Sequence, residues 1–216
     1  MKELTTKKMN NIGIPIAILS LMIGYAILTV GVPIIESISL AAGGFVGLYS
    51  LFGIEGLKVG FKKPKKGIRT FLYFYVCAVV LSLVMASVVK NILHASTAAN
   101  EVTEHLSPLF LIETLPMLLG EELLTIVILV IVANLLGGTR KAIVAGVLVS
   151  SVLFGLIHLP TYQWNLLQCL LIIGVGRIPF TVASLKSDSI WAGYFVHVAY
   201  DWTAFIVILL SMKGFF

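Results

Sequence analysis

Residues 108–136 read PLFLIETLPMLLGEELLTIVILVIVANLL, a long apolar run with two adjacent glutamates near its middle. A bilayer core about 30 Å thick is crossed by about 20 apolar residues in a helix. The run is therefore long enough to span a membrane once, although Pro116 and Gly120 interrupt it. Charge inside hydrocarbon costs at least about 2.5–3.5 kcal/mol per residue on insertion scales, so the two glutamates require an explanation.

Six further apolar runs surround this one, and the whole composition fits a membrane protein. Of the 216 residues, 59% are hydrophobic and only 12% are charged, whereas a soluble domain carries about 25% charged residues. An ordinary soluble enzyme and a disordered regulator are thereby excluded. Strand alternation of the outer-membrane barrel type is absent, so the spans are expected to be helices. The other runs are about Ile12–Ile35, Ile38–Leu57, Thr70–Leu93, Ala142–Leu159, Trp164–Leu185 and Ile190–Met212.

The predicted fold class is therefore all-α, a polytopic transmembrane helix bundle of about seven spans, within a range of six to eight. No internal repeat, low-complexity tract or soluble linker divides the chain. We expect one integral-membrane domain over residues 1–216, with a motif-bearing core at about 108–212.

The positive charges predict the orientation of the bundle. The net charge is +5, and nine of the 15 Lys and Arg residues flank apolar runs, either near the N-terminus or around Phe61–Arg69 (FKKPKKGIR). Basic loops are typical of the cytoplasmic side, so the N-terminus and Phe61–Arg69 are predicted to be cytoplasmic in a multi-pass protein of the cell membrane. Such residues contact anionic lipid. No basic face interleaved with aromatic residues is present, so nucleic acid is not expected as a partner.

Glu121 and Glu122 are the first candidates for chemistry inside the spans. Consecutive helix residues point about 100° apart, so one glutamate can face a central cavity while the other meets a neighbouring helix. Two carboxylates this close in a low dielectric do not both ionise easily. That coupling suits one of them to act as a general base. A structural pair held by hydrogen bonds is the alternative.

His197 and Asp201 form a second candidate pair. They are four residues apart and share one helical face, so the carboxylate can fix the tautomer and orientation of the ring. A hydrogen-bonded packing pair would give the same pattern. Helix geometry makes His197 look shallow in the membrane, unless the last helix starts before Ile190 or the sixth run breaks at Pro179.

His158 closes the fifth run in the tract FGLIHLP, where Pro160 ends the helix. Glu121 lies 16 residues before Gly137, and His158 lies 17 residues after Lys141. At 1.5 Å per residue, two antiparallel helices joined by this turn bring Glu121 and His158 to nearly the same level. This match in level favours the interpretation that His158 belongs to the same site as Glu121 and is more than an interfacial histidine.

These three motifs, in this order, resemble the CPBP family of intramembrane proteases, the CAAX-protease and bacteriocin-processing group also called Abi. The family pattern is Glu-Glu-x-x-x-Arg, then Phe-x-x-x-His, then His-x-x-x-Asn/Asp. The tract 189–193 (SIWAG) also resembles the family's lead into its third motif, and the likeness covers about Pro116–Trp202. One position departs from the pattern, because Ile126 stands where the family has Arg. We hypothesise that Arg177, inside the sixth run, supplies the missing cation; a snorkelling or structural arginine is the alternative.

The resemblance implies hydrolysis of peptide bonds within the bilayer. Glu121 would take a proton from water, and His158 would help to position it. His197 and Asp201 would bind the oxyanion or orient that group, and Glu122 would support them from behind. No cofactor is required on this mechanism. Zinc stays open, because Glu121, His158 and His197 also form a plausible ligand set.

The resemblance further implies a small hydrophobic or lipidated peptide as substrate, in bacteriocin self-immunity or peptide processing. Two other functions remain open. The chain could be a catalytically impaired immunity or binding protein that uses the same cavity, with Ile126 marking lost catalysis. A proton-coupled transporter would also explain intramembrane Glu, His and Asp, although it usually brings paired repeats. The oligomeric state is not indicated.

Overall fold

The computed structural model describes residues 1–30, 35–101, 103 and 106–212, and these residues form helices and no strands. Within that described part, seven helical segments are long and apolar enough to cross a membrane, which confirms the predicted all-α bundle. Residues 31–34, the end of the first predicted run, lie outside the described residues. The elements are α1 (Lys2–Thr6), α2 (Gly13–Val30), α3 (Ile35–Gly60), α4 (Gly67–Ser87), η1 (Val88–Ile92), α5 (Pro108–Leu135), α6 (Arg140–Ile157), η3 (Pro160–Tyr162), η4 (Gln168–Gly174), α7 (Ile178–Ser187) and α8 (Ile190–Met212).

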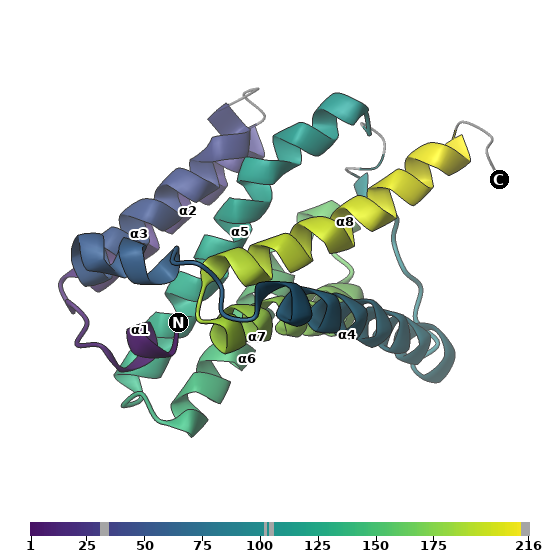
Figure 1. Cartoon of the computed structure of the whole chain (residues 1–216). Coiled ribbons are helices and arrows are strands. Elements are labelled where there is room, and N and C mark those ends of the chain that lie inside the picture. The colour runs from purple at the N-terminus through teal and green to yellow at the C-terminus, as the bar shows by residue number, and fades with distance from the viewer. Residues whose placement is uncertain (31–34, 102, 104–105, 213–216) are drawn as a thin grey trace.

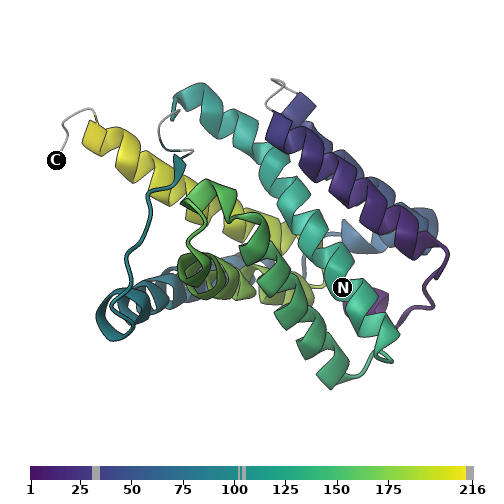
Figure 2. The same cartoon turned by 180° about the vertical axis from the view of Figure 1, so that it is seen from behind.

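Helix α5 is the centre of the bundle. Figures 1 and 2 show it running between α2 and α3 on one side and α7 and α8 on the other. In its most apolar stretch 67% of the residues are buried, against 22% in α2 and 17% in the span formed by α4 and η1. A helix that is apolar all round is suited to such a central position. The two glutamates of α5 are therefore placed in the interior.

Close contact between α3 and its neighbours depends on two adjacent glycines. A Cβ added at Gly43 would collide with the backbone carbonyl of Ser20 on α2, and one at Gly44 would collide with the Leu123 side chain on α5. Small residues let helix backbones approach closely where lipid supplies no hydrophobic driving force. This close packing holds α3 against the part of α5 that carries Glu121.

The turn between α5 and α6 has well-defined caps. Gly137 and Gly138 both have positive φ, and their N–H groups donate to the carbonyls of Asn134 and Ala133, which is the Schellman arrangement at a helix C-terminus. Thr139 then caps α6, its hydroxyl accepting from the N–H of Ala142 at 3.2 Å. The tight turn makes α5 and α6 antiparallel neighbours, which is the arrangement that brings Glu121 and His158 to nearly the same level.

The sixth predicted run, Trp164–Leu185, corresponds to one candidate span, Gln168–Ser187, whose helix is irregular. The π-helix η4 is followed by a turn at Arg177, and α7 starts at Ile178. Proline at position 179 lacks an N–H and crowds the preceding turn, which is why it sits in the first turn of α7.

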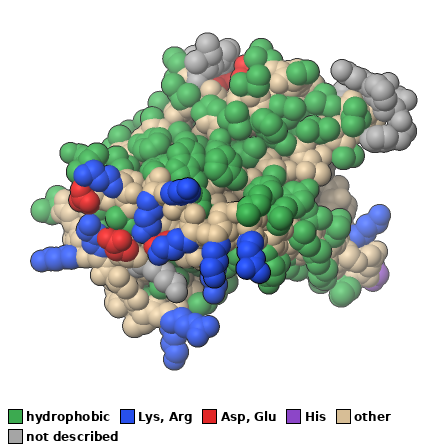
Figure 3. Space-filling model, viewed as in Figure 1, with side chains coloured by type: hydrophobic (Ala, Val, Ile, Leu, Met, Phe, Trp, Pro, Cys, Tyr) green, Lys and Arg blue, Asp and Glu red, His purple; other side chains and the backbone are tan. Residues whose placement is uncertain are grey.

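The surface separates apolar and basic side chains. Figure 3 shows hydrophobic side chains over most of one face, and most Lys and Arg side chains in its lower part, near α1 and the segment that joins α3 to α4. That segment contains Lys62 and Lys65, whose ammonium groups lie 2.8 Å and 3.0 Å from Asp188 at the α7–α8 turn. The separation fits a multi-pass membrane protein, whereas the cytoplasmic side of the basic segment remains a prediction.

Candidate active site

A cavity of about 710 Å³ opens between the helices, and four of the five predicted site residues line it. They are Glu121, His158, His197 and Asp201. Glu122 lies behind the wall with a fully buried side chain. The two glutamates therefore divide as expected for neighbours on a helix, one facing the cavity and the other facing a neighbouring helix.

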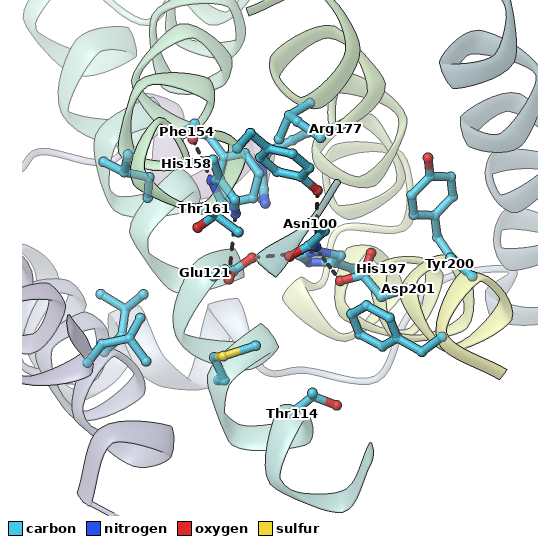
Figure 4. Close-up of a pocket in the computed structure, with 18 of the residues that line it drawn as sticks. Asn100, Thr114, Glu121, Phe154, His158, Thr161, Arg177, His197, Tyr200 and Asp201 are labelled. Atoms are coloured by element: carbon cyan, nitrogen blue, oxygen red, sulfur yellow. Dashed lines mark hydrogen bonds and ion pairs between the residues drawn. The ribbon is translucent and has the colours of Figure 1, made fainter. Parts of the chain in front are cut away.

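The Glu121 carboxylate lies between two imidazole rings (Figure 4). Its Oε1 is 4.0 Å from Nε2 of His158, and its Oε2 is 3.6 Å from Nε2 of His197. Glu121 and His158 lie together, in agreement with the predicted match in level, and His197, which looked shallow from the sequence, reaches the same carboxylate. All three motifs therefore converge on one carboxylate.

Each histidine is held by a contact at its other nitrogen. Nδ1 of His158 lies 2.8 Å from the carbonyl oxygen of Phe154, and Nδ1 of His197 lies 3.0 Å from Oε1 of Glu122. A carbonyl can only accept, so Nδ1 of His158 carries the hydrogen, and in the neutral ring Nε2 is left with a lone pair. A hydrogen bond at one nitrogen fixes the ring's orientation and tautomer. Both Nε2 atoms are thus presented to Glu121.

Glu122 connects His197 to a buried cation. Nη2 of Arg177 lies 3.0 Å from the same Glu122 oxygen that contacts His197, and both side chains of this ion pair are at most 1% exposed. The Arg177 guanidinium also lies over the Phe154 ring, 4.2 Å from its centroid. Ile126 is fully buried in the hydrophobic core. The contact of Arg177 with one of the two glutamates is confirmed, and its role as a substitute for the arginine of the first motif stays a hypothesis.

Gly193 explains part of the tract before His197. A Cβ at this position would lie 2.9 Å from Oε2 of Glu122 and would collide with the hydroxyl of Ser184. Without a side chain at Gly193, α8 can approach α7 and α5 closely enough for His197 to reach Glu122. Close packing of α8 therefore accounts for the glycine at position 193, before the third motif.

Asp201 meets His197 from the other side. Its Oδ2 is 3.4 Å from Nε2 of His197, which confirms that the pair shares one face of α8. A hydrogen on this nitrogen would point toward the carboxylates of Glu121 and Asp201. In this arrangement His197 holds the two carboxylates together, and Glu122 at Nδ1 holds the ring.

Two polar residues of the cavity wall, Asn100 and Tyr162, were not singled out from the sequence. Both line the cavity, and the side-chain nitrogen of Asn100 donates to the Tyr162 hydroxyl at 3.2 Å. Asn100 belongs to a non-helical segment, which has no periodicity to mark it. Tyr162 stands four residues after His158, and that spacing is the one signal that could have found it.

The predicted zinc set does not form a compact ligand group. Across the ranges that the structure describes, no three His, Cys, Asp or Glu side chains are arranged to hold a metal ion. Zinc bound by Glu121, His158 and His197 stays an untested alternative to metal-free activation of water by Glu121.

Comparison with known proteins supports a protease-type site. Residues 103–203, just under half of the 216-residue chain, match the family model described as Type II CAAX prenyl endopeptidase Rce1-like. The match confirms the resemblance seen in the sequence, and it spans all five predicted site residues. No curated protein and no solved structure gives a significant match.

Proposed function

We propose that this chain is an intramembrane endopeptidase in which Glu121 activates water. The observation that carries the proposal is the position of the Glu121 carboxylate, faced by Nε2 of both His158 and His197 on the wall of a cavity between the helices. The likeness of residues 103–203 to a protease family supports it. A structural role alone would be met more cheaply by apolar side chains.

The gap between Glu121 and His158 suits a water molecule. At 4.0 Å the two atoms are too far apart for a direct hydrogen bond, which needs about 2.7–3.2 Å. A water lodged against both atoms would donate one hydrogen to Glu121 and the other to Nε2 of His158. Its lone pair would then be free to attack a peptide carbonyl in the cavity.

The reaction follows from this placement. Glu121 accepts a proton from water as the water oxygen bonds to the carbonyl carbon, and the carbonyl π electrons move onto the oxygen to give an oxyanion. Collapse of the tetrahedral intermediate breaks the C–N bond, and the proton held by Glu121 passes to the leaving amine. The step needs no cofactor from the chain.

The remaining site residues act on Glu121 and not on the substrate. His197 lies between Glu121 and Asp201, so we assign it and Asp201 the task of orienting the base. Glu122 fixes the His197 ring, and Arg177 balances the buried carboxylate of Glu122. Donors that orient a base without contacting substrate are a recurrent feature of hydrolytic sites.

The proposed substrate is a small hydrophobic or lipidated peptide in the cell membrane. The wall of the cavity includes many apolar side chains between its polar groups, among them Leu28, Leu40 and Phe205. The family description names a prenylated CAAX peptide, so such a peptide is one candidate, and a bacteriocin-like peptide in self-immunity or processing is another.

The test is peptide cleavage by the purified protein in detergent. Wild type should cleave members of a hydrophobic peptide library that includes a prenylated CAAX peptide, and Glu121→Gln and His158→Ala should lose about 10²–10⁴-fold or more in rate. Glu113→Gln is the matched control, because Glu113 is exposed, lies on the same helix and lines the same cavity. It should keep wild-type activity.

Other outcomes would point to the other functions. Wild type that cleaves nothing, but binds peptides in the cavity, would favour a membrane immunity or binding protein. Proton-driven uptake of a substrate into liposomes would favour a transporter. Cleavage that is lost in chelator and restored by zinc would overturn the metal-free mechanism.

A further inference from the structure

The cavity lies toward one end of the bundle. Its wall is formed by the end of α2, the start of α3, the first half of α5 and the ends of α6 and α8. Figure 1 shows the first turns of α5 and the last turns of α8 pointing to the same side of the molecule. We call this side the mouth end, and its wall residues include Leu28, Glu36, Phe110, Tyr162 and Ile208. The cavity therefore extends from Glu121 toward one surface of the membrane.

The cavity wall at the mouth end contains many polar side chains. They are Thr29, Glu36, Ser37, Asn100, Thr103, Glu113 and Thr161. Thr29 and Glu113 are exposed. Because a carboxylate facing hydrocarbon is costly, a wall of this kind is suited to contact with water. A peptide can therefore enter the cavity from the aqueous side at the mouth end.

The other half of α5, from Glu121 to the α5–α6 turn, is tightly packed. Its side chains at Leu123, Leu124, Ile126, Val127, Leu129 and Val130 are at most 5% exposed, and the cavity wall includes none of these described residues. Helix α1 lies against the far end of this half, where Asn134 donates to the Leu4 carbonyl at 2.9 Å. In the part of the chain that the structure describes, Glu121 is thus reached from the mouth end and not from the α5–α6 turn.

The positive charges gather at the packed end, which we call the basic end. Of the 15 Lys and Arg residues, 12 precede α2 or flank the α3–α4 segment, the α5–α6 turn or the α7–α8 turn. The other three are Lys90, the buried Arg177 and Lys213, which lies outside the described residues. Lys and Arg in short loops mark the cytoplasmic side of a membrane. This rule assigns the basic end to the cytoplasm and the mouth end to the other side.

From this opposition of the two ends we propose that the cavity opens on the non-cytoplasmic side of the membrane. Resting on the proposed endopeptidase function, its substrate is then a hydrophobic peptide present on that side. The depth of Glu121 does not decide the side, because Glu121 lies 13 residues after Pro108 and 14 before Leu135, about 20 Å from either end of α5 at 1.5 Å per residue. The direction of the cavity decides it. A peptide anchored in the cytoplasmic leaflet by a prenyl group would meet the packed end.

Cysteine labelling in intact cells tests the side directly. Thr29→Cys and Lys63→Cys are made in a chain whose own Cys77 and Cys169 are replaced by alanine, and both variants are first shown to react with a maleimide in detergent. Thr29 is exposed in the cavity wall, and Lys63 is exposed in the segment between α3 and α4. A membrane-impermeant maleimide should label Thr29→Cys in intact cells, whereas Lys63→Cys should be labelled only after the cells are permeabilised.

A second position at the mouth end guards against a local effect at Thr29. Ser96 is exposed and precedes Asn100 of the cavity wall in a non-helical segment, so Ser96→Cys should behave as Thr29→Cys does. The inference is overturned if both mouth positions stay unlabelled in intact cells. It is equally overturned if Lys63→Cys is labelled there, because the basic end would then lie outside.

Cleavage by sealed membrane vesicles tests the substrate. Right-side-out and inside-out vesicles receive a charged, water-soluble form of the best library peptide in the external medium, and vesicles with Glu121→Gln give the background. Right-side-out vesicles should cleave the peptide at once, whereas cleavage by inside-out vesicles should be lost until detergent opens them.

The vesicle results separate this inference from the proposed function. The reverse pattern, with cleavage by intact inside-out vesicles alone, would overturn the inference and leave the endopeptidase standing. If wild type cleaves no peptide even in detergent, the proposed function and the substrate assigned here both fail, whereas the labelling still decides the side on which the cavity opens.

Discussion

Two clusters of charged side chains lie in this molecule in contrasting surroundings. The rim cluster gathers Lys62, Lys65 and the Met1 amine around Asp188, whose side chain is 15% exposed. The buried cluster centres on Glu121, and its inner ion pair has side-chain exposures of 1% and 0%. The buried cluster consists of Glu121, Glu122, His158, Arg177, His197 and Asp201.

The difference in solvent exposure distinguishes charges that stabilise the fold from charges that need another explanation. The two lysines of the rim cluster are 33% and 70% exposed, so their charges cost little, and they hold the α7–α8 turn against the segment between α3 and α4. A fully buried pair such as Arg177 and Glu122 bears a large desolvation penalty, and apolar replacements are often as stable. Stability therefore does not explain the buried cluster, whereas orientation of His197 does.

The largest effect is expected from Arg177→Met, which leaves Glu122 buried without its cation. Breaking one side of a buried ion pair destabilises by about 3–5 kcal/mol. Thermal unfolding in detergent should show this loss, and the double variant Glu122→Gln/Arg177→Met should recover part of it because no lone charge remains. If Arg177→Met kept wild-type stability and cleavage rate, the distinction between the buried cluster and the rim cluster would be wrong.

Glu122→Gln should lower the cleavage rate as well as the stability, because it leaves the buried Arg177 cation without its counter-charge. The amide is isosteric but neutral, so it holds His197 and Arg177 less strongly than the carboxylate does. Groups that orient a functional histidine are typically worth about 10–100-fold in activity. Peptide cleavage measures this, with Glu113→Gln as the control on the same helix. An unchanged rate would mean that the His197 ring does not depend on Glu122.

The stability that the rim cluster provides should depend on pH, and this effect should be smaller than those of the two substitutions in the buried cluster. Burial alone would raise the pKa of Asp188, but hydrogen bonds from Lys62, the Met1 amine and Lys65 outweigh it and hold that pKa below its usual value. A lowered pKa means that the stabilisation is complete above the ordinary Asp pKa of about 3.9 and is lost as the pH falls below it.

Asp188→Asn is the variant that isolates this contribution. It should cost about 1 kcal/mol or less at neutral pH. The difference in unfolding temperature between wild type and variant should shrink on acidification below about pH 4. A difference that grew on acidification would contradict the assignment.

The smallest effect is expected where charges are fully exposed. Glu55 and Lys58 form an ion pair of 2.8 Å on α3, and both side chains are more than half exposed. Exposed pairs contribute little because solvent screens them. Lys58→Met should leave both the unfolding temperature and the cleavage rate unchanged. A marked fall in either would show that the exposure of a charged pair does not determine its contribution.

Much of the fold could be predicted from the sequence because the bilayer sets the length of each span. The predicted run Ile190–Met212 coincides with α8, and the run Pro108–Leu136 with α5 to within one residue. A break at Pro179 was only a condition in the prediction, and the structure instead has a turn at Arg177, because packing decides where a helix bends. The Arg177–Glu122 pair was likewise a hypothesis until the fold brought α5 and α7 together.

The site could be predicted only where helical spacing or motif order carried information. Helix geometry matched the levels of Glu121 and His158, whereas it left His197 too shallow, and only the order of the motifs placed His197 in the same site. Asn100 and Tyr162 were missed because the non-helical residues 96–100 and the short helix η3 have no repeating pattern. Asn165 and Gln168 hydrogen-bond to the backbone of Ser96 and Ala98, and no spacing rule connects those side chains to this segment.

The most direct test of the central claim is cleavage of the best library peptide in ¹⁸O-labelled water. If Glu121 activates water, a single turnover by wild type places one ¹⁸O in the new carboxyl group, hydroxylamine traps no acyl intermediate, and Glu121→Gln gives no product above background. Formation of a hydroxamate, or cleavage by Glu121→Gln at the wild-type rate, would contradict the account.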